Sequence, residues 1–156
     1  MEIGVLIDDE LEGCPEMSWL EGIVEQVLLA QRVGSSVELG LVITSQERVQ
    51  ELNRLYRGKD KPTDVLAFAT REEIADSPSF VQPPDGVLHL GEVIISYPQA
   101  IIQAKEHQHS TKKEVAILII HGVLHLLGFE HDEPEREFQM KAREAEILSD
   151  IEGGLS

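Results

Sequence analysis

Cysteine is almost absent from this chain: Cys14 is the single one among 156 residues. A lone cysteine cannot form an internal disulfide, and without a second thiol nearby we do not expect a thiolate metal cluster. We therefore interpret Cys14 as a bystander rather than a functional thiol.

Long apolar runs are also missing. No stretch approaches the roughly 18 residues that a membrane-spanning helix requires. The acidic opening MEIGVLIDDE does not show the charged and then apolar pattern of a signal peptide. We find no internal repeat and expect a cytoplasmic protein.

Basic residues are scarce, with 13 lysines and arginines against 29 acidic residues and a net charge of -16. Such a balance argues against tight, non-specific, charge-driven binding to nucleic acid. Any contact with phosphate must therefore be local. Most of the acidic surface is explained by solubility.

The length fits one domain covering residues 1–156, with a core of the usual size. Apolar periodicity and capping residues predict its elements. Strands are expected at 2–8, 37–44, 64–69 and 88–96, and helices at 16–32, 45–55, 98–107, 111–127 and 133–150. The proline-rich segment 71–87 is predicted to be a mobile loop, and residues 152–156 a frayed tail.

Four of these helices have a predicted inner stripe, which in the helix 98–107 is Ala100, Ile101 and Ala104, and three helices have predicted ends. The other expected stripes are Met17, Leu20, Ile23, Val24, Val27 and Leu28; Val49, Leu52 and Leu55; and Phe138, Ala142, Ala145 and Leu148. Gly34 is placed to stop the first helix, and Ser45 to cap the second. Ser110 or Thr111 caps the long helix, with Glu114 at capping-box distance from Thr111. Because Val115 to Ile120 is apolar nearly all round, this helix should be buried.

Three of the six histidines fall within eleven residues of the stretch EVAILIIHGVLHLLGFEHD. His121 and His125 are four apart and therefore share one face of a helix. Gly128 can end that helix in the left-handed conformation, which lets the chain bring His131 back. Three imidazoles leave a position open for water or substrate, as in catalytic zinc sites. The pattern predicts a divalent metal, zinc first, although nickel, copper and iron also bind imidazole.

Acidic and histidine residues elsewhere have more ordinary interpretations. Glu130 and Asp132 could orient the metal-binding imidazoles. His107 and His109 are two apart among lysines, and a solvated turn is favoured for them. His89 and Glu92 are three apart in a strand, which places them on opposite faces and makes a direct pair unlikely. Glu92 needs a partner or exposure.

A second unusual segment is basic: Arg54, Arg57, Lys59 and Lys61 lie within eight residues, and Asp60 is their only acid. Gly58 and Pro62 place these cations on a loop before a strand. The segment could be a solvated turn that suits the end of a helix dipole, or a functional loop.

The histidine spacing also matches the metzincin proteases, whose motif is H-E-x-x-H-x-x-G-x-x-H. Gly122 occupies the position of their water-activating glutamate, so a peptidase would lack its general base. No Met-turn follows, because Met140 lies in a predicted helix. A metallopeptidase is therefore the weaker hypothesis.

Taken together, HGVLHLLGFEHD, NRLYRGKDKPTDVLAFAT and LGEVIIS resemble the YbeY family of bacterial endoribonucleases, which act in ribosomal RNA maturation and ribosome quality control. The resemblance covers Asn53 to Asp132. The chain departs from the usual family pattern at Glu130, at Gly91-Glu92-Val93, at Ala67 and at Ala69-Thr70. The first two changes keep the charge, and the last two leave the local loop geometry open.

The resemblance implies an α+β fold, with a small mixed β-sheet of about four strands and about five helices. It implies one metal, usually zinc, held by His121, His125 and His131, and an activity-relevant Arg57 in the same cleft. The expected partners are single-stranded regions of ribosomal RNA and the small ribosomal subunit or its assembly factors. The metal would polarise a water or a phosphoryl oxygen, and Arg57 would neutralise phosphate charge.

Some roles stay open. Lys59 and Lys61 would hold the flanking RNA backbone. The general base is unassigned, and Glu92 is a weak candidate. A non-catalytic ribosome-assembly factor with a structural metal is the alternative from another class, although structural zinc sites are usually closed by four protein ligands.

Overall fold

The computed structural model describes residues 2–33, 36–58, 63–69, 88–128 and 133–151. Within these ranges the chain forms four strands and five helices, which confirms the predicted α+β class. The strands are β1 (Glu2–Ile7), β2 (Val37–Thr44), β3 (Val65–Ala69) and β4 (Leu88–Ser96). The helices are α1 (Met17–Ala30), α2 (Gln46–Arg57), α3 (Tyr97–Glu106), α4 (Thr111–Leu126) and α5 (Pro134–Ile151).

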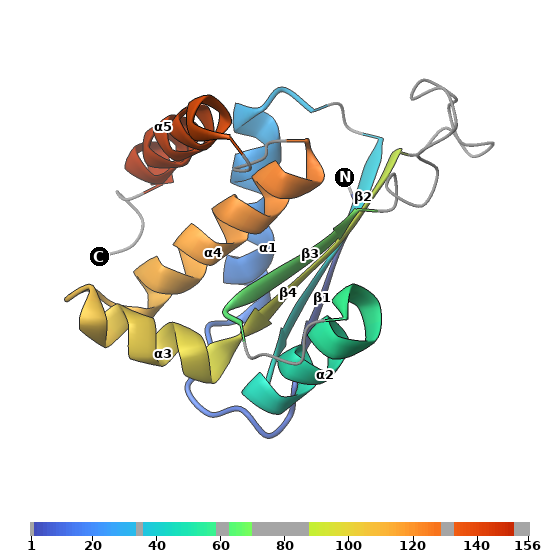
Figure 1. Cartoon of the computed structure of the whole chain (residues 1–156), viewed down its shortest axis with the longest axis vertical. Helices are drawn as coiled ribbons and strands as arrows, with labels where there is room; N and C mark the ends of the chain where they lie inside the picture. The colour runs from blue at the N-terminus through green and yellow to red at the C-terminus, as the bar shows by residue number, and fades with distance from the viewer. Residues whose placement is uncertain (1, 34–35, 59–62, 70–87, 129–132, 152–156) are drawn as a thin grey trace.

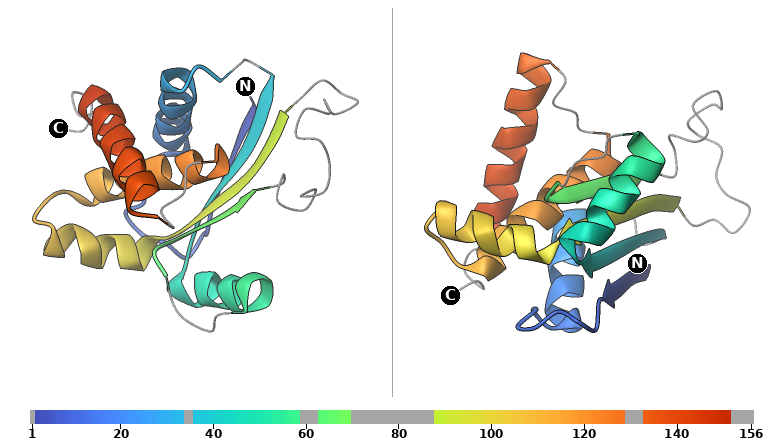
Figure 2. Two further views of the ribbon diagram at one scale, coloured as in Figure 1. Left: turned by 45° about the horizontal axis from the view of Figure 1, so that its top comes forward. Right: turned by 60° about the horizontal axis from the view of Figure 1, so that its bottom comes forward.

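The four strands form one mixed sheet in the order β1-β2-β4-β3. β1, β2 and β4 are parallel, and the edge strand β3 runs antiparallel to β4. Figure 1 and the left view of Figure 2 show α2 on one face of the sheet and the other four helices on the opposite face. The two faces are therefore covered unequally, and the long helix α4 lies on the thicker side.

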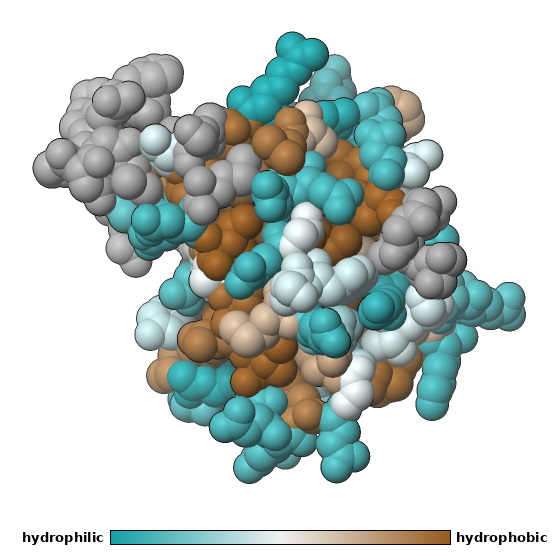
Figure 3. Space-filling view, turned by 180° about the vertical axis from the view of Figure 1, so that it is seen from behind, coloured by the Kyte–Doolittle hydropathy of each residue, from teal (hydrophilic) through white to brown (hydrophobic). Residues whose placement is uncertain are grey.

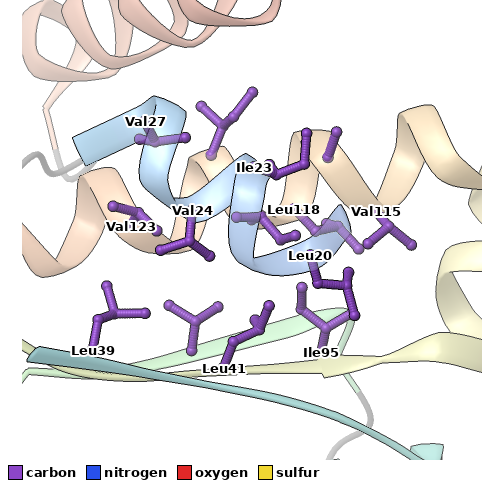
Figure 4. Close-up of a cluster of buried hydrophobic side chains, with 14 of the residues drawn as sticks. Leu20, Ile23, Val24, Val27, Leu39, Leu41, Ile95, Val115, Leu118 and Val123 are labelled. Atoms are coloured by element: carbon purple, nitrogen blue, oxygen red, sulfur yellow. The ribbon is translucent and has the colours of Figure 1, made fainter. Parts of the chain in front are cut away.

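The main core lies between the sheet and the helices α1 and α4. Figure 4 shows side chains of α1 and α4 pointing toward those of the strands. The labelled members are Leu20, Ile23, Val24, Val27, Val115, Leu118, Val123, Leu39, Leu41 and Ile95, and all of them are buried. Complete burial of one such side chain contributes about 1.5–3 kcal/mol, so this contact fixes α4 on the sheet.

The inner apolar stripes predicted for α1 and α2 are largely correct, but each includes one residue that is exposed in the structure. In α1 the five residues from Leu20 to Leu28 are buried, whereas Met17 in the first turn is exposed. In α2 the stripe starts with the buried Val49, but Leu55 is exposed. Ser45 caps α2 as predicted, by accepting the amide of Arg48. Gly34, the predicted helix stop, lies outside the described residues.

The stripe predicted for α5 is wrong at three of its four residues; the fourth, Leu148, is partly buried against the core. Phe138 is 73% exposed, and Ala142 and Ala145 are also exposed. The buried residues are instead Met140, Ile147 and Ile151. Their spacing is also helical, so periodicity alone allowed two stripes, and packing against α4 selected the less obvious one.

A β-bulge in β4 overturns the prediction that His89 and Glu92 lie on opposite faces. Glu38 pairs with His89, but Leu39 pairs with Gly91, so β4 has one extra residue at this point. The extra residue moves both side chains onto the same face, where they line a shallow pocket. Gly91 permits the bulge: its φ is +129°, and a Cβ would lie 2.0 Å from the carbonyl oxygen of Phe68.

The surface is mixed rather than uniformly polar. On the face shown in Figure 3, apolar side chains are exposed in separate patches between hydrophilic ones. None of the helices in the described ranges is long and apolar enough to cross a membrane. The predicted loop 71–87 and tail 152–156 fall outside the described residues.

Candidate metal centre

The two helical histidines of the predicted centre lie in the last two turns of α4. Ser110 caps the start of this helix by accepting the amide of Lys113. His121 and His125 are both half-buried and stand one turn, about 5–6 Å, apart along the same face. Just past the helix, Gly128 has a φ of +102°, the left-handed conformation predicted for it.

A carboxylate from another helix orients the first of these imidazoles. Oε1 of Glu144 in α5 lies 2.7 Å from Nδ1 of His121. The side chains are 34% exposed for His121 and 21% for Glu144, so the pair sits at the edge of the core. The hydrogen bond to Glu144 raises the pKa of His121, burial opposes this, and the charges of Glu144 and Asp64 add to the rise.

This hydrogen bond selects which ring nitrogen is left for a metal. When Nδ1 of a neutral histidine donates to a carboxylate, the lone pair that can bind a metal is on Nε2. Carboxylate, imidazole and metal in a row are the usual arrangement around protein zinc. The geometry of His121 therefore fits a divalent metal that prefers nitrogen ligands.

Sequence reasoning missed Glu144, although a signal was present. Glu144 occupies the stripe of Met140, Ile147 and Ile151, the face of α5 that is buried against the rest of the fold. A single acid in an apolar stripe requires a partner. The orienting role was assigned instead to Glu130 and Asp132, which lie outside the described residues.

The structure explains why a glycine is needed at position 122, where the metzincin proteases have a glutamate. It is buried beside β4, and a Cβ built on it would lie 2.5 Å from Cγ1 of Val93. Any side chain here would push α4 away from the sheet. A glutamate at this position would therefore collide with the strand, which disfavours a metzincin-like mechanism on steric grounds.

The remaining predicted site residues are only partly described. His131, Lys59 and Lys61 lie outside the described residues. Arg57 is the last residue of α2, and Gly58 follows it as a left-handed cap. Helices α2 and α4 lie on opposite faces of the sheet, and the edge strand β3 contacts both. The grouping of Arg57 with the histidines stays a prediction.

Glu92 is a poor candidate for the general base. Its neighbour Val93 faces α4 at Gly122. Because consecutive strand residues face opposite ways, Glu92 faces the side of the sheet away from His121. It is exposed there and lines the pocket formed with Glu2, Glu38 and His89.

His107 and His109 lie in the predicted turn, and His107 is exposed, but the prediction missed that both rings contact a buried carboxylate. Nδ1 of His107 and Nε2 of His109 lie 2.7 Å and 3.2 Å from Oε1 of Glu114. Glu114 is buried and does not form a capping box, because the helix cap is Ser110 and not Thr111. The sequence placed these three residues near one another but could not show that they converge.

Cys14 remains outside this chemistry. Burial raises the pKa of its thiol, which keeps it protonated and weakly nucleophilic. Its neighbour Tyr97 donates a 2.8 Å hydrogen bond to the carbonyl oxygen of Gly13. These contacts are consistent with a bystander in a packed corner.

Comparison with known proteins gives a consistent result. Residues 10–152 match the family model described as endoribonuclease YbeY. A Dehalococcoides mccartyi protein named endoribonuclease YbeY is 46% identical over 148 residues, covering 92% of this chain and 86% of its own. A relative of the same name from Roseiflexus sp. is 46% identical over 138 residues, covering 88% and 83%. The solution structure of a Thermotoga maritima protein matches with a TM-score of 0.63 and 25% identity, covering 98% of this chain and 91% of that one.

Proposed function

The chain belongs to the YbeY family of endoribonucleases, and on that premise we propose that it is a zinc-dependent endoribonuclease. Its substrate is single-stranded ribosomal RNA in the cytoplasm, and its role is the maturation and quality control of ribosomes. It acts as one domain together with the small ribosomal subunit or its assembly factors. The observation that carries the metal part of the proposal is the 2.7 Å contact between His121 and Glu144.

The metal ligands are His121, His125 and His131. The contact with Glu144 supports the first of these, because it fixes the ring orientation and makes Nε2 a better donor. When bound, zinc supplies a Lewis acid for phosphodiester hydrolysis. Glu144 acts through His121 and is therefore a positioning residue.

Arg57 neutralises the charge that grows on the phosphate during cleavage, and Lys59 and Lys61 hold the flanking RNA backbone. The net charge of -16 supports this division, because it disfavours non-specific binding elsewhere on the surface.

The first experiment pairs elemental analysis of purified protein with cleavage of single-stranded RNA, repeated for His125→Ala. Wild-type protein is expected to bind zinc at this centre and to cleave RNA. The variant is expected to bind one zinc ion fewer per chain than wild type and to lose RNA cleavage. Metal-loaded protein that binds ribosomal subunits tightly but cleaves no RNA would instead identify a non-catalytic assembly factor. Peptide cleavage that is lost on metal removal would identify a metallopeptidase.

The second experiment tests the cationic loop. Arg57→Ala is expected to abolish RNA cleavage while the metal content stays intact, because the residue acts on phosphate and not on the metal. Arg48→Ala is the matched control, since Arg48 lies exposed at the other end of α2, where it pairs with Glu51. Full activity of Arg57→Ala would remove the assigned role.

A further inference from the structure

Three side chains with metal-binding atoms converge at the turn between α3 and α4. They are His107 and His109, which follow α3, and Glu114, in the first turn of α4. Their ligand atoms all lie within 4.8 Å of one another. Oε1 of Glu114 is the common point, at 2.7 Å from Nδ1 of His107 and 3.2 Å from Nε2 of His109.

The backbone of the turn is what brings the two imidazoles together. The amide of Gln108 donates to the carbonyl of Lys105, and the amide of His109 to that of Ala104, which is the Schellman pattern at a helix end. This pattern requires a left-handed residue, and Gln108 adopts it with a φ of 58°. A non-glycine residue there costs about 1 kcal/mol, so the conformation is held by its surroundings.

Because it is buried, the carboxylate of Glu114 is the group of the cluster that most needs a cation or hydrogen-bond donors beside it. Its side chain is 2% exposed, against 19% for His109 and 56% for His107. A buried carboxylate is unfavourable unless hydrogen-bonded or bound to a cation. The start of α4 supplies a favourable helix dipole, and the two imidazoles supply the remaining partners. In this cluster the carboxylate of Glu114 lies deepest and the two imidazoles lie above it. Solvent reaches the cluster on the side of His107, the most exposed of the three residues.

We propose that His107, His109 and Glu114 form a second divalent-metal site, separate from the His121 centre, that takes zinc or a similar transition-metal ion. Tetrahedral zinc with bonds of about 2.0–2.1 Å holds its ligand atoms about 3.3 Å apart. To reach this separation, the 2.7 Å contact must open by about 0.6 Å and the 3.2 Å contact by about 0.1 Å, and the two ring nitrogens already lie within 4.8 Å of each other. The exposed ring of His107 can make that movement, and water completes the coordination from the open side.

The position of this site separates it from the chemistry proposed at His121. Glu114 precedes His121 by seven residues, which is about 10.5 Å along a helix. Two-metal catalytic centres hold their ions about 3.5–4 Å apart, so the two sites do not act on one phosphate together. An ion at Glu114 would instead tie the end of α3 to the start of α4. Its expected effect is on the stability of this turn.

Lys112 and Lys105 bring positive charge to the neighbourhood of the turn. Lys112, in the first turn of α4, extends toward α1, where its Nζ lies 5.2 Å from the ring centre of Trp19. Lys105 is exposed in the last turn of α3. Their charges weaken the attraction for a cation through solvent, and this effect is screened by salt.

The experiment uses the full chain carrying His125→Ala, so that the count of ions does not depend on the centre proposed for RNA cleavage. Metal-free protein is titrated with Zn²⁺ and bound metal is measured after gel filtration. One ion per chain is expected, and none after His107→Ala and His109→Ala are added. A protein that binds no zinc in the His125→Ala form would overturn the proposal, as would retention of the ion without His107 and His109.

Three further measurements control for unrelated causes of a change in zinc binding. His89→Ala, which removes a histidine on the other face of the sheet, should leave the ion in place. Circular dichroism checks that the variants are folded, and the single exposed change His107→Ala replaces the double one if they are not. Zn²⁺ should also raise the melting temperature of the His125→Ala protein but not that of the variant lacking His107 and His109. An equal rise in both would also overturn the proposal.

Discussion

Replacing Glu144 tests whether the contact with His121 tunes a metal centre. Glu144→Gln keeps the size of the side chain and an oxygen that can accept from Nδ1, but it removes the negative charge at 2.7 Å from the ring. Loss of such a partner typically weakens metal binding 10–100-fold. We expect about tenfold weaker zinc binding for Glu144→Gln, which is about 1.4 kcal/mol, and a loss nearer 100-fold for Glu144→Ala.

The assay is competition for Zn²⁺ against a coloured chelator at constant pH. It is made in protein carrying His107→Ala and His109→Ala, so that a single centre is titrated. Glu146→Gln is the control, because Glu146 lies on the same helix but is exposed and pairs with Arg143. Affinities of Glu144→Gln and the control that agree within about twofold would refute the argument.

The other predictions concern stability and pH. Gly122→Ala should lower the free energy of urea unfolding by about 1–3 kcal/mol, because the new methyl group meets Val93. The control is Gly22→Ala in α1, where a Cβ would have nothing within 4 Å and the change should be neutral or stabilising. Equal effects of the two changes would contradict the packing argument. In metal-free protein, Glu144 raises the pKa of His121, so the stability from this pair is complete below about pH 6.5 and is lost as pH rises through the elevated pKa. The free energies of urea unfolding of wild type and Glu144→Gln should therefore converge as the pH rises above about 6.5, and divergence would be inconsistent with this linkage.

Local patterns in the sequence determined most of the elements. Ser45 and Ser110 are caps in the structure because a hydroxyl before a helix satisfies a free backbone amide regardless of the rest of the fold. The spacing of His121 and His125 likewise required only that α4 be helical. The apolar run before them required burial, and α4 is the central buried helix.

Tertiary structure decided what these local patterns left open. Helical periodicity allowed two stripes on α5, and only packing against the rest of the fold turned Glu144 toward His121. The bulge at Gly91 places His89 on the same face of the sheet as Glu92. Side chains alternate between the two faces along a strand, and one extra residue shifts this alternation.

The candidate site shows the same division. The sequence predicted a metal site on α4, since imidazole spacing on a helix is a local property, and it pointed to the family. It did not determine that Glu144 orients His121, that Gly122 must be small to let α4 approach Val93, or that Glu114 lies beneath two imidazoles. Each of these contacts joins different elements or the two sides of a turn, and such contacts depend on how the elements pack rather than on the residues within any one of them.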